Sequence, residues 1–349
     1  MKLPKAKKIN VEKYIAGLSL FKKKSARIKL SANESALGPS PKAIRVFNKT
    51  ARSIQRYPDS NGIYLKKIIS KKFNLDLKRI ILGSGSDQIF ELICKAFLSS
   101  NDEVIVSKNS FILYRIYSKL NGAKILFAKE NNFNTSVENI LSLVTRKTKI
   151  VFLANPNNPT GTYINKKNLT RLRKKLRSNI LLVIDDAYYE YVNKKDYQSG
   201  LKLFSQRKNV VITRTFSKIF GLAGLRVGWA YSSKEIIKSL EKIRPPFAIN
   251  SPGLAAAATA LSDTRWLRKE LNHINKWRNI LFKNFKKMKI DTNKGNANFL
   301  LINFDKAKIS SKKVFRNLAK SGILIRNMDA YKIKNSLRVT IGTASENKE

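Results

Sequence analysis

The chain has 349 residues, of which 43% are hydrophobic and only 15 are glycine, a composition that supports a large core and excludes a disordered protein. Its 70 basic and 23 acidic residues give a formal charge of +47, but the lysines recur along the whole chain, which argues against a nucleic-acid-binding protein. The longest apolar stretches, such as Ile180 to Ile184 and Gly253 to Leu261, fall short of the roughly 20 residues that cross a bilayer. We therefore expect a soluble protein with no membrane or nucleic-acid partner.

The N-terminal stretch from Met1 to Lys8 is basic, but no apolar segment of signal-peptide length follows it. The single cysteine, Cys94, cannot form an internal disulfide. These features predict a cytoplasmic location. The chain stops seven residues after Gly342.

Short apolar runs alternate with segments of helical spacing from about residue 41 to residue 245, which predicts a mostly parallel sheet flanked by helices. The first helix begins at Ser40-Pro41, and its apolar face is expected to continue through Ala43, Ile44, Phe47, Ala51 and Ile54. Seven strands are predicted for one sheet, at residues 80–82, 103–106, 124–127, 150–153, 181–184, 210–213 and 227–231.

Pro245-Pro246 interrupts this alternation, because the two prolines restrict the backbone and remove donors. We predict a large domain at 41–245 and a smaller α+β domain formed by 1–40 together with 246–349. The second domain is expected to contain helices at 254–261 and 266–288 and strands at 299–304, 322–326 and 336–341.

Polar residues follow the predicted strands, at the edge of the sheet where ligands bind in open α/β folds. Gly83 to Asp87 follows the first strand and opens a helix, so its amides form an anion site. Asn155 to Gly161, Asp185 with Tyr188, and Thr215 to Lys218 follow three later strands, and a glycine-rich segment, Gly221 to Gly228, comes next.

Three of these motifs, Asn-Pro-Asn-Asn-Pro-Thr-Gly, Asp-Asp-Ala-Tyr and Ser-Lys-x-x-Gly-Leu-Ala-Gly-Leu-Arg-Val-Gly, resemble the fold-type I pyridoxal-phosphate aminotransferases in order and spacing. Further segments resemble the histidinol-phosphate aminotransferases within that family. They are Asn33-Glu34, Arg56 to Asp59, Gly85 to Asp87, Ile325 to Asn327 and Leu337 to Gly342.

The resemblance implies three catalytic residues. Lys218 matches the lysine that carries pyridoxal 5′-phosphate and shuttles the proton during transamination. Asp185 is expected to face the ring nitrogen of the cofactor and keep it protonated. Tyr188, together with Asn158, is expected to donate to the 3′-oxygen.

The same comparison implies the other cofactor contacts. Phe111 would stack on the ring, where relatives commonly have a tyrosine, so the hydroxyl of that tyrosine is missing. The phosphate would lie against Ser86, Asp87, Thr215, Ser217 and Arg226, because a guanidinium fork suits a dianion. Tyr57 would reach the cofactor phosphate of a neighbouring subunit, which predicts a homodimer.

The resemblance further implies transamination of histidinol phosphate with 2-oxoglutarate, and no metal site. Arg338 would bind the carboxylate of glutamate, and Arg326, Tyr14 and Asn33 would hold the phosphate of histidinol phosphate. An aromatic amino acid aminotransferase and a threonine-phosphate-type decarboxylase stay open as alternatives on the same scaffold. A basic nucleic-acid-binding protein would leave Lys218 and Asp185 unexplained.

Overall fold

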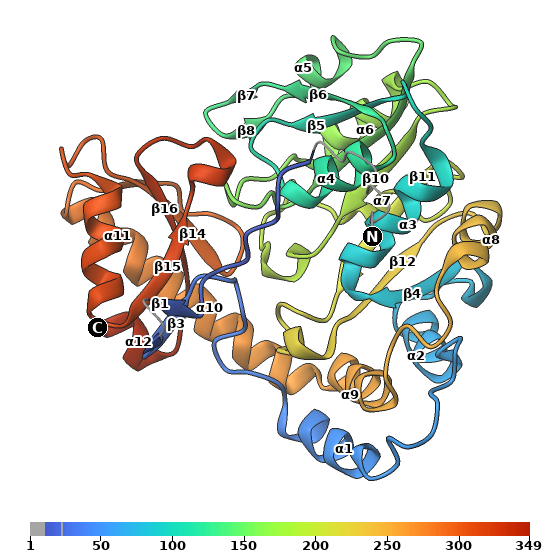
Figure 1. Cartoon of the computed structure of the whole chain (residues 1–349), viewed down its shortest axis with the longest axis horizontal. Coiled ribbons are helices and arrows are strands. Elements are labelled where there is room, and N and C mark those ends of the chain that lie inside the picture. Colours follow the sequence, from blue (N-terminus) through green and yellow to red (C-terminus); the bar gives the residue numbers. More distant parts are fainter. Residues whose placement is uncertain (1–10, 22–23) are drawn as a thin grey trace, which may run out of the picture.

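The structure, a computed structural model, describes residues 11–21 and 24–349. A seven-stranded sheet dominates it, in the order β4 (Ile80–Ser84), β12 (Val227–Tyr231), β11 (Val210–Thr215), β10 (Leu181–Asp185), β9 (Thr148–Ala154), β5 (Glu103–Ser107) and β6 (Lys124–Ala128) (Figure 1). The pairs from β6 to β11 are parallel, whereas β12 runs antiparallel to both β11 and β4. The predicted seven-stranded, mostly parallel sheet is confirmed.

Both faces of the inner strands of this sheet are buried, as crossover helices require. Along β9, Ile150 and Phe152 join the apolar core on one face, and Val151 and Leu153 join the core on the other. The helices of this part are α2 (Ile63–Phe73), α3 (Gly85–Phe97), α4 (Ile112–Leu120), α5 (Val137–Leu141), α6 (Lys166–Lys175), α7 (Gly200–Phe204) and α8 (Lys234–Ile243), and a short hairpin joins β7 (Glu130–Asn131) to β8 (Asn134–Thr135).

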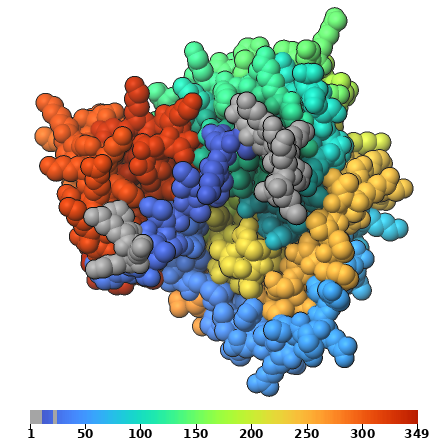
Figure 2. All heavy atoms as spheres, viewed as in Figure 1, coloured from blue at the N-terminus to red at the C-terminus, as the bar shows by residue number. Residues whose placement is uncertain are grey.

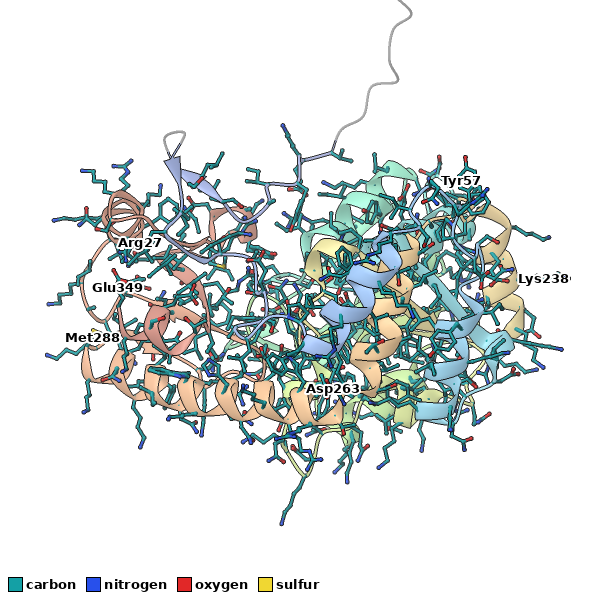
Figure 3. All side chains as sticks on the ribbon, turned by 90° about the horizontal axis from the view of Figure 1, so that it is seen from below. Arg27, Tyr57, Lys238, Asp263, Met288 and Glu349 are labelled. Carbon is teal, nitrogen blue, oxygen red and sulfur yellow. The ribbon has the colours of Figure 1, made fainter. Side chains whose placement is uncertain are left out.

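A second sheet has five strands, in the order β13 (Asp291–Thr292), β14 (Phe299–Asn303), β16 (Ser336–Thr340), β15 (Ile323–Asn327) and β3 (Ile28–Leu30). Because β3 pairs in parallel with β15, part of the N-terminal 40 residues joins the C-terminal part. The helices here are α10 (Thr264–Lys287), α11 (Ser311–Lys320) and α12 (Ala344–Lys348), and β1 (Leu20–Phe21) pairs with β2 (Lys24–Ser25). Figure 3 shows α10 running along one side of the molecule between the labelled Asp263 and Met288.

Two helices bear on the predictions made from the sequence. Helix α1 (Pro41–Ala51) begins at the predicted proline, with Ser40 as its N-cap, but it ends at Ala51. The expectation that its apolar face continues to Ile54 is wrong, because Ile54 lies beyond the helix and is 69% exposed.

Helix α9 (Ser251–Ser262) follows the predicted domain boundary yet packs on α1 and α2 and enters the core of the larger sheet. The division at 245 stays a prediction.

Among the described residues, no helix combines the length and apolarity needed to cross a membrane. That same part of the chain contains no group of three or more His, Cys, Asp or Glu residues arranged to hold a metal ion. The stretch Met1 to Lys8 lies outside the described residues.

Candidate active site

A cavity of about 370 Å³ lies where the two sheets meet. The large sheet lines it with residues that follow β4, β9, β10 and β11, and the second sheet lines it with residues of β15 and β16. The N-terminal segment adds Tyr14 and Asn33, and Figure 2 shows this dark-blue segment lying between the red C-terminal part and the teal part of the molecule. The cavity gathers fourteen of the predicted site residues: Tyr14, Asn33, Ser86, Asp87, Phe111, Asn158, Asp185, Tyr188, Thr215, Ser217, Lys218, Arg226, Arg326 and Arg338.

One end of the cavity is a cradle for an anion. Helix α3 begins there, so its first-turn amides have no partners within the helix. Arg226 donates to the Ser217 hydroxyl at 3.3 Å and pairs with Asp87 at 3.0 Å. Gly85 has a φ of +71°, and a Cβ at this position would collide with the Arg226 guanidinium. Because Gly85 has no side chain, the start of α3 and the Arg226 guanidinium can lie next to each other.

Asp185 ends β10 at the floor of the cavity and is buried. Its Oδ1 accepts from the Ala187 amide at 3.1 Å and from the Thr213 hydroxyl at 3.4 Å. Its Oδ2 accepts from the Tyr114 hydroxyl at 2.6 Å. Burial raises the pKa of Asp185 to about 6, against these stabilising donors. The carboxylate is thus ionised at neutral pH, and three donors keep it in place.

Lys218 follows β11 and lines the same cavity. Its Nζ is 3.5 Å from the carbonyl oxygen of Ala32 and 5.8 Å from the centre of the Tyr188 ring. Burial, with a smaller contribution from the Arg338 guanidinium, lowers the pKa of Lys218 to about 8. A substantial fraction of this amine is therefore neutral near physiological pH, which is the nucleophilic form.

Tyr188 and Asn158 are arranged as donors. The Tyr188 hydroxyl accepts from the Asn33 side-chain amide at 2.9 Å, so its own proton can be donated elsewhere. Burial raises the pKa of Tyr188 to about 12, which keeps that proton on the phenol at neutral pH. Asn158 accepts a hydrogen bond from Arg338 through Oδ1, which leaves its amide nitrogen as a donor.

Two arginines lie side by side on neighbouring strands of the second sheet. Arg326 of β15 and Arg338 of β16 are register partners, and both are buried and line the cavity. Arg326 donates to the Ile15 carbonyl at 2.5 Å, and Arg338 donates to the Ser31 carbonyl at 3.0 Å. Among the described residues neither forms a salt bridge. Directly opposed like charges are unfavourable, so this arrangement favours binding of an anion.

Tyr57 is the predicted site residue that the cavity of this chain does not contain. It is 83% exposed and stacks on Phe247, with ring centres 4.5 Å apart. Figure 3 shows Tyr57 at the periphery of the molecule.

Two tyrosines at the site were not predicted from the sequence. Tyr331 lines the cavity, and Tyr114, which does not line it, donates to Asp185. Tyr114 could have been noticed from its position three residues after Phe111, because one helical turn places such residues side by side.

Comparison with known proteins agrees with this geometry. Residues 25–349 match the family of aminotransferases of class I and II. The chain belongs to that family. It is 51% identical to the histidinol-phosphate aminotransferase of Pelagibacter ubique over 99% of this chain and 97% of that protein. It is 40% identical to that of Paramagnetospirillum magneticum, over 97% and 94%. The predicted family, and the predicted resemblance to these aminotransferases, are confirmed.

The fold also matches a solved structure. The histidinol-phosphate aminotransferase of Sinorhizobium meliloti, crystallised in complex with pyridoxal-5′-phosphate, superposes with a TM-score of 0.87 at 24% identity, over 93% of this chain and 89% of that one. This likeness confirms the predicted fold class.

Proposed function

We propose that the protein catalyses transamination of L-histidinol phosphate with 2-oxoglutarate, giving imidazole acetol phosphate and glutamate, as a step of histidine biosynthesis. Family membership establishes an aminotransferase that uses pyridoxal 5′-phosphate. The observation that carries the substrate choice is the pair of opposed, buried arginines, Arg326 and Arg338, in the same cavity as Lys218. Both proposed substrates are anions, and one of them carries a phosphate.

The cavity residues fit the cofactor. The anion cradle at the start of α3, with Arg226 and Ser217, suits a phosphate dianion, and Thr215 and Ser86 add hydroxyls. Asp185 supplies a negative charge for a ring nitrogen, and Tyr188 and Asn158 supply neutral donors for a ring oxygen. Phe111 offers an aromatic face without a hydroxyl. When bound, pyridoxal 5′-phosphate acts as an electron sink for the bonds at the substrate Cα.

Side chains of the protein move the proton and bind the substrates. The Lys218 amine, neutral in part because of burial, would hold the cofactor and, once displaced by the substrate amine, would move a proton at its Nζ. Asp185 keeps a positive charge on the ring by remaining ionised. Arg338, held by Ser31 and Asn158, orients the α-carboxylate of glutamate. Arg326, with Tyr14 and Asn33, holds the phosphate of histidinol phosphate.

Replacing Arg326 with alanine tests the substrate assignment. Losing a charge-assisted contact with phosphate should cost about 1.5 to 3 kcal/mol, which lowers kcat/KM for histidinol phosphate roughly 10- to 150-fold. The loss for phenylalanine, which has no phosphate, should be much smaller. Steady-state kinetics with both donors measure the ratio.

Arg316→Ala, which removes an exposed arginine of α11, is the matched control. It lowers the net positive charge of the protein by the same amount, but Arg316 does not line the cavity. Equal losses for both donors in Arg326→Ala would contradict the assignment. So would a wild-type enzyme that prefers phenylalanine, because that result identifies an aromatic aminotransferase. Release of carbon dioxide without glutamate formation would identify the decarboxylase alternative.

We further propose that the protein works as a homodimer in which Tyr57 enters the active site of the partner subunit. Tyr57 and Phe247 form an exposed aromatic pair, and Ile54 and Tyr64 are 69% and 66% exposed nearby in the chain. Exposed apolar groups of this size are typical of an interface. The charge of +47 opposes association, so the apolar contact must outweigh it. The cytoplasmic location stays a prediction.

Hybrid dimers test the shared site. We expect a mixture of Lys218→Ala and Tyr57→Ala subunits, at limiting cofactor, to recover about a quarter of wild-type activity, because half the dimers are hybrids with one intact site. Each variant alone should stay well below this level. Sedimentation should show a dimer throughout. No recovery on mixing, or an active wild-type monomer at micromolar concentration, would overturn the dimer proposal.

A further inference from the structure

The buried hydroxyl nearest to Asp185 belongs to Tyr114. Tyr114 is fully buried in α4 and donates to Asp185 Oδ2 at 2.6 Å. The bond joins residues 71 positions apart in the chain. It is the shortest of the three hydrogen bonds that reach this carboxylate from the described residues.

Three aromatic neighbours pack against the Tyr114 ring. The ring stacks on Phe152 of β9 with centres 4.9 Å apart and planes 3° apart. Phe90 of α3 and Phe111 stand edge-on to it, at 5.0 and 5.6 Å. A ring held on three sides points its hydroxyl in one direction, so the donor is preorganised for the carboxylate.

The hydroxyl acts on both the position and the charge of Asp185. A donor to a carboxylate stabilises its ionised form, and here it opposes the burial that raises the pKa of Asp185. The other titratable groups near this carboxyl are Asp87 of α3 and, beyond β10, Asp186 and Tyr188. The negative charge of Asp87 raises the pKa of Asp185 further, whereas the hydrogen bond from Tyr114 stabilises the ionised form of Asp185.

We propose that Tyr114 is a positioning residue for transamination: its hydroxyl orients the Asp185 carboxylate toward the cofactor and keeps that carboxylate ionised. This inference rests on the proposed role of Asp185. Without the hydroxyl, one carboxylate oxygen is left buried and unpaired, and the carboxyl is then more easily protonated. A neutral Asp185 cannot hold a positive charge on the cofactor ring.

Tyr114→Phe removes the hydroxyl and keeps the ring, so the packing with Phe152 and Phe90 should persist. We expect kcat to fall roughly 10- to 100-fold, with KM and cofactor affinity changing less than about threefold. Tyr117→Phe is the matched control, because Tyr117 lies one turn further along α4, half-buried, and makes no side-chain hydrogen bond to a described residue. The control should retain wild-type kinetics.

An absorbance titration separates this role from a merely structural one. The bound cofactor has two nitrogens that can carry a proton. When the ring nitrogen loses its proton, the other nitrogen becomes more basic, so the pH midpoint of the cofactor's absorbance change should move upward in Tyr114→Phe. Tyr117→Phe should leave the midpoint unchanged. An unchanged midpoint in Tyr114→Phe, or a thermal unfolding temperature of the apo-protein that falls in step with activity, would overturn the inference.

A double-mutant cycle with Asp185→Asn separates failure of this inference from failure of the proposed function. If Tyr114 acts through Asp185, its substitution should cost less than about threefold in the Asp185→Asn background. A slow Asp185→Asn variant with a wild-type-like Tyr114→Phe variant would refute only the role of Tyr114. A fully active Asp185→Asn variant would refute the role of Asp185, and with it the role of Tyr114, but not the transamination itself.

Discussion

Lys218→Ala should abolish transamination, with a loss of at least roughly 10⁴-fold, because the substitution removes both the nucleophile and the proton carrier. The remaining cradle around Arg226 should still bind the cofactor without a covalent bond. Borohydride reduction followed by mass spectrometry checks this directly, since the wild type should gain the cofactor mass and the variant should not. Lys238→Ala, which removes an exposed lysine of α8 labelled in Figure 3, is the control.

The lowered pKa of Lys218 adds a pH dependence to this result. Burial disfavours the ammonium, and covalent attachment needs the neutral amine, so the rate at which the apo-protein captures the cofactor should rise with pH and level off above about 8. Wild-type activity in Lys218→Ala, or a capture rate that rises only near the usual lysine pKa, would contradict the assignment.

Asp185→Asn should lower kcat roughly 10²- to 10⁴-fold while the cofactor stays bound and attached. Asparagine keeps a single acceptor oxygen, so it can accept either from Tyr114 or from Thr213 and the Ala187 amide, and it carries no charge to hold a proton on the ring nitrogen. Steady-state kinetics and cofactor titration separate the effect on kcat from the effect on affinity. Asp196→Asn, at an exposed position, should have no effect on either.

The stability of this variant distinguishes lost chemistry from lost folding. The pKa of Asp185 is raised from 3.8 to about 6 in the folded protein, so ionising it costs stability as pH rises through that window, and the full cost is present above about 6. Removing the charge removes this cost, which offsets the hydrogen bond that the amide loses, so the apo-protein at pH 7 should be about as stable as the wild type. A large drop in its unfolding temperature, or an unchanged kcat, would show that Asp185 does not act as proposed.

The sequence by itself was enough for the features that depend on neighbouring residues. Seven apolar runs bounded by turns predicted the seven strands, because burial on both faces leaves a continuous apolar pattern that can be read locally. The anion site at Gly83 to Asp87 was predicted because a strand end and the loop after it are contiguous in the chain, whereas the phosphate contacts of Thr215, Ser217 and Arg226 came from the resemblance to the aminotransferases. The types of residue that line the cavity could therefore be predicted from the sequence, although the shape of the cavity could not.

Only the tertiary structure decided which distant side chains meet. The opposition of Arg326 and Arg338 depends on the register between β15 and β16, and the bond from Tyr114 to Asp185 depends on how α4 packs against the sheet. Tyr114 has the spacing of an ordinary core aromatic, and Ile54 has the spacing of a helix face that in fact ends at Ala51. Hydrophobic periodicity reports whether a residue is buried, but the partner of a buried polar atom is set by strand order, register and helix packing, which no local pattern records.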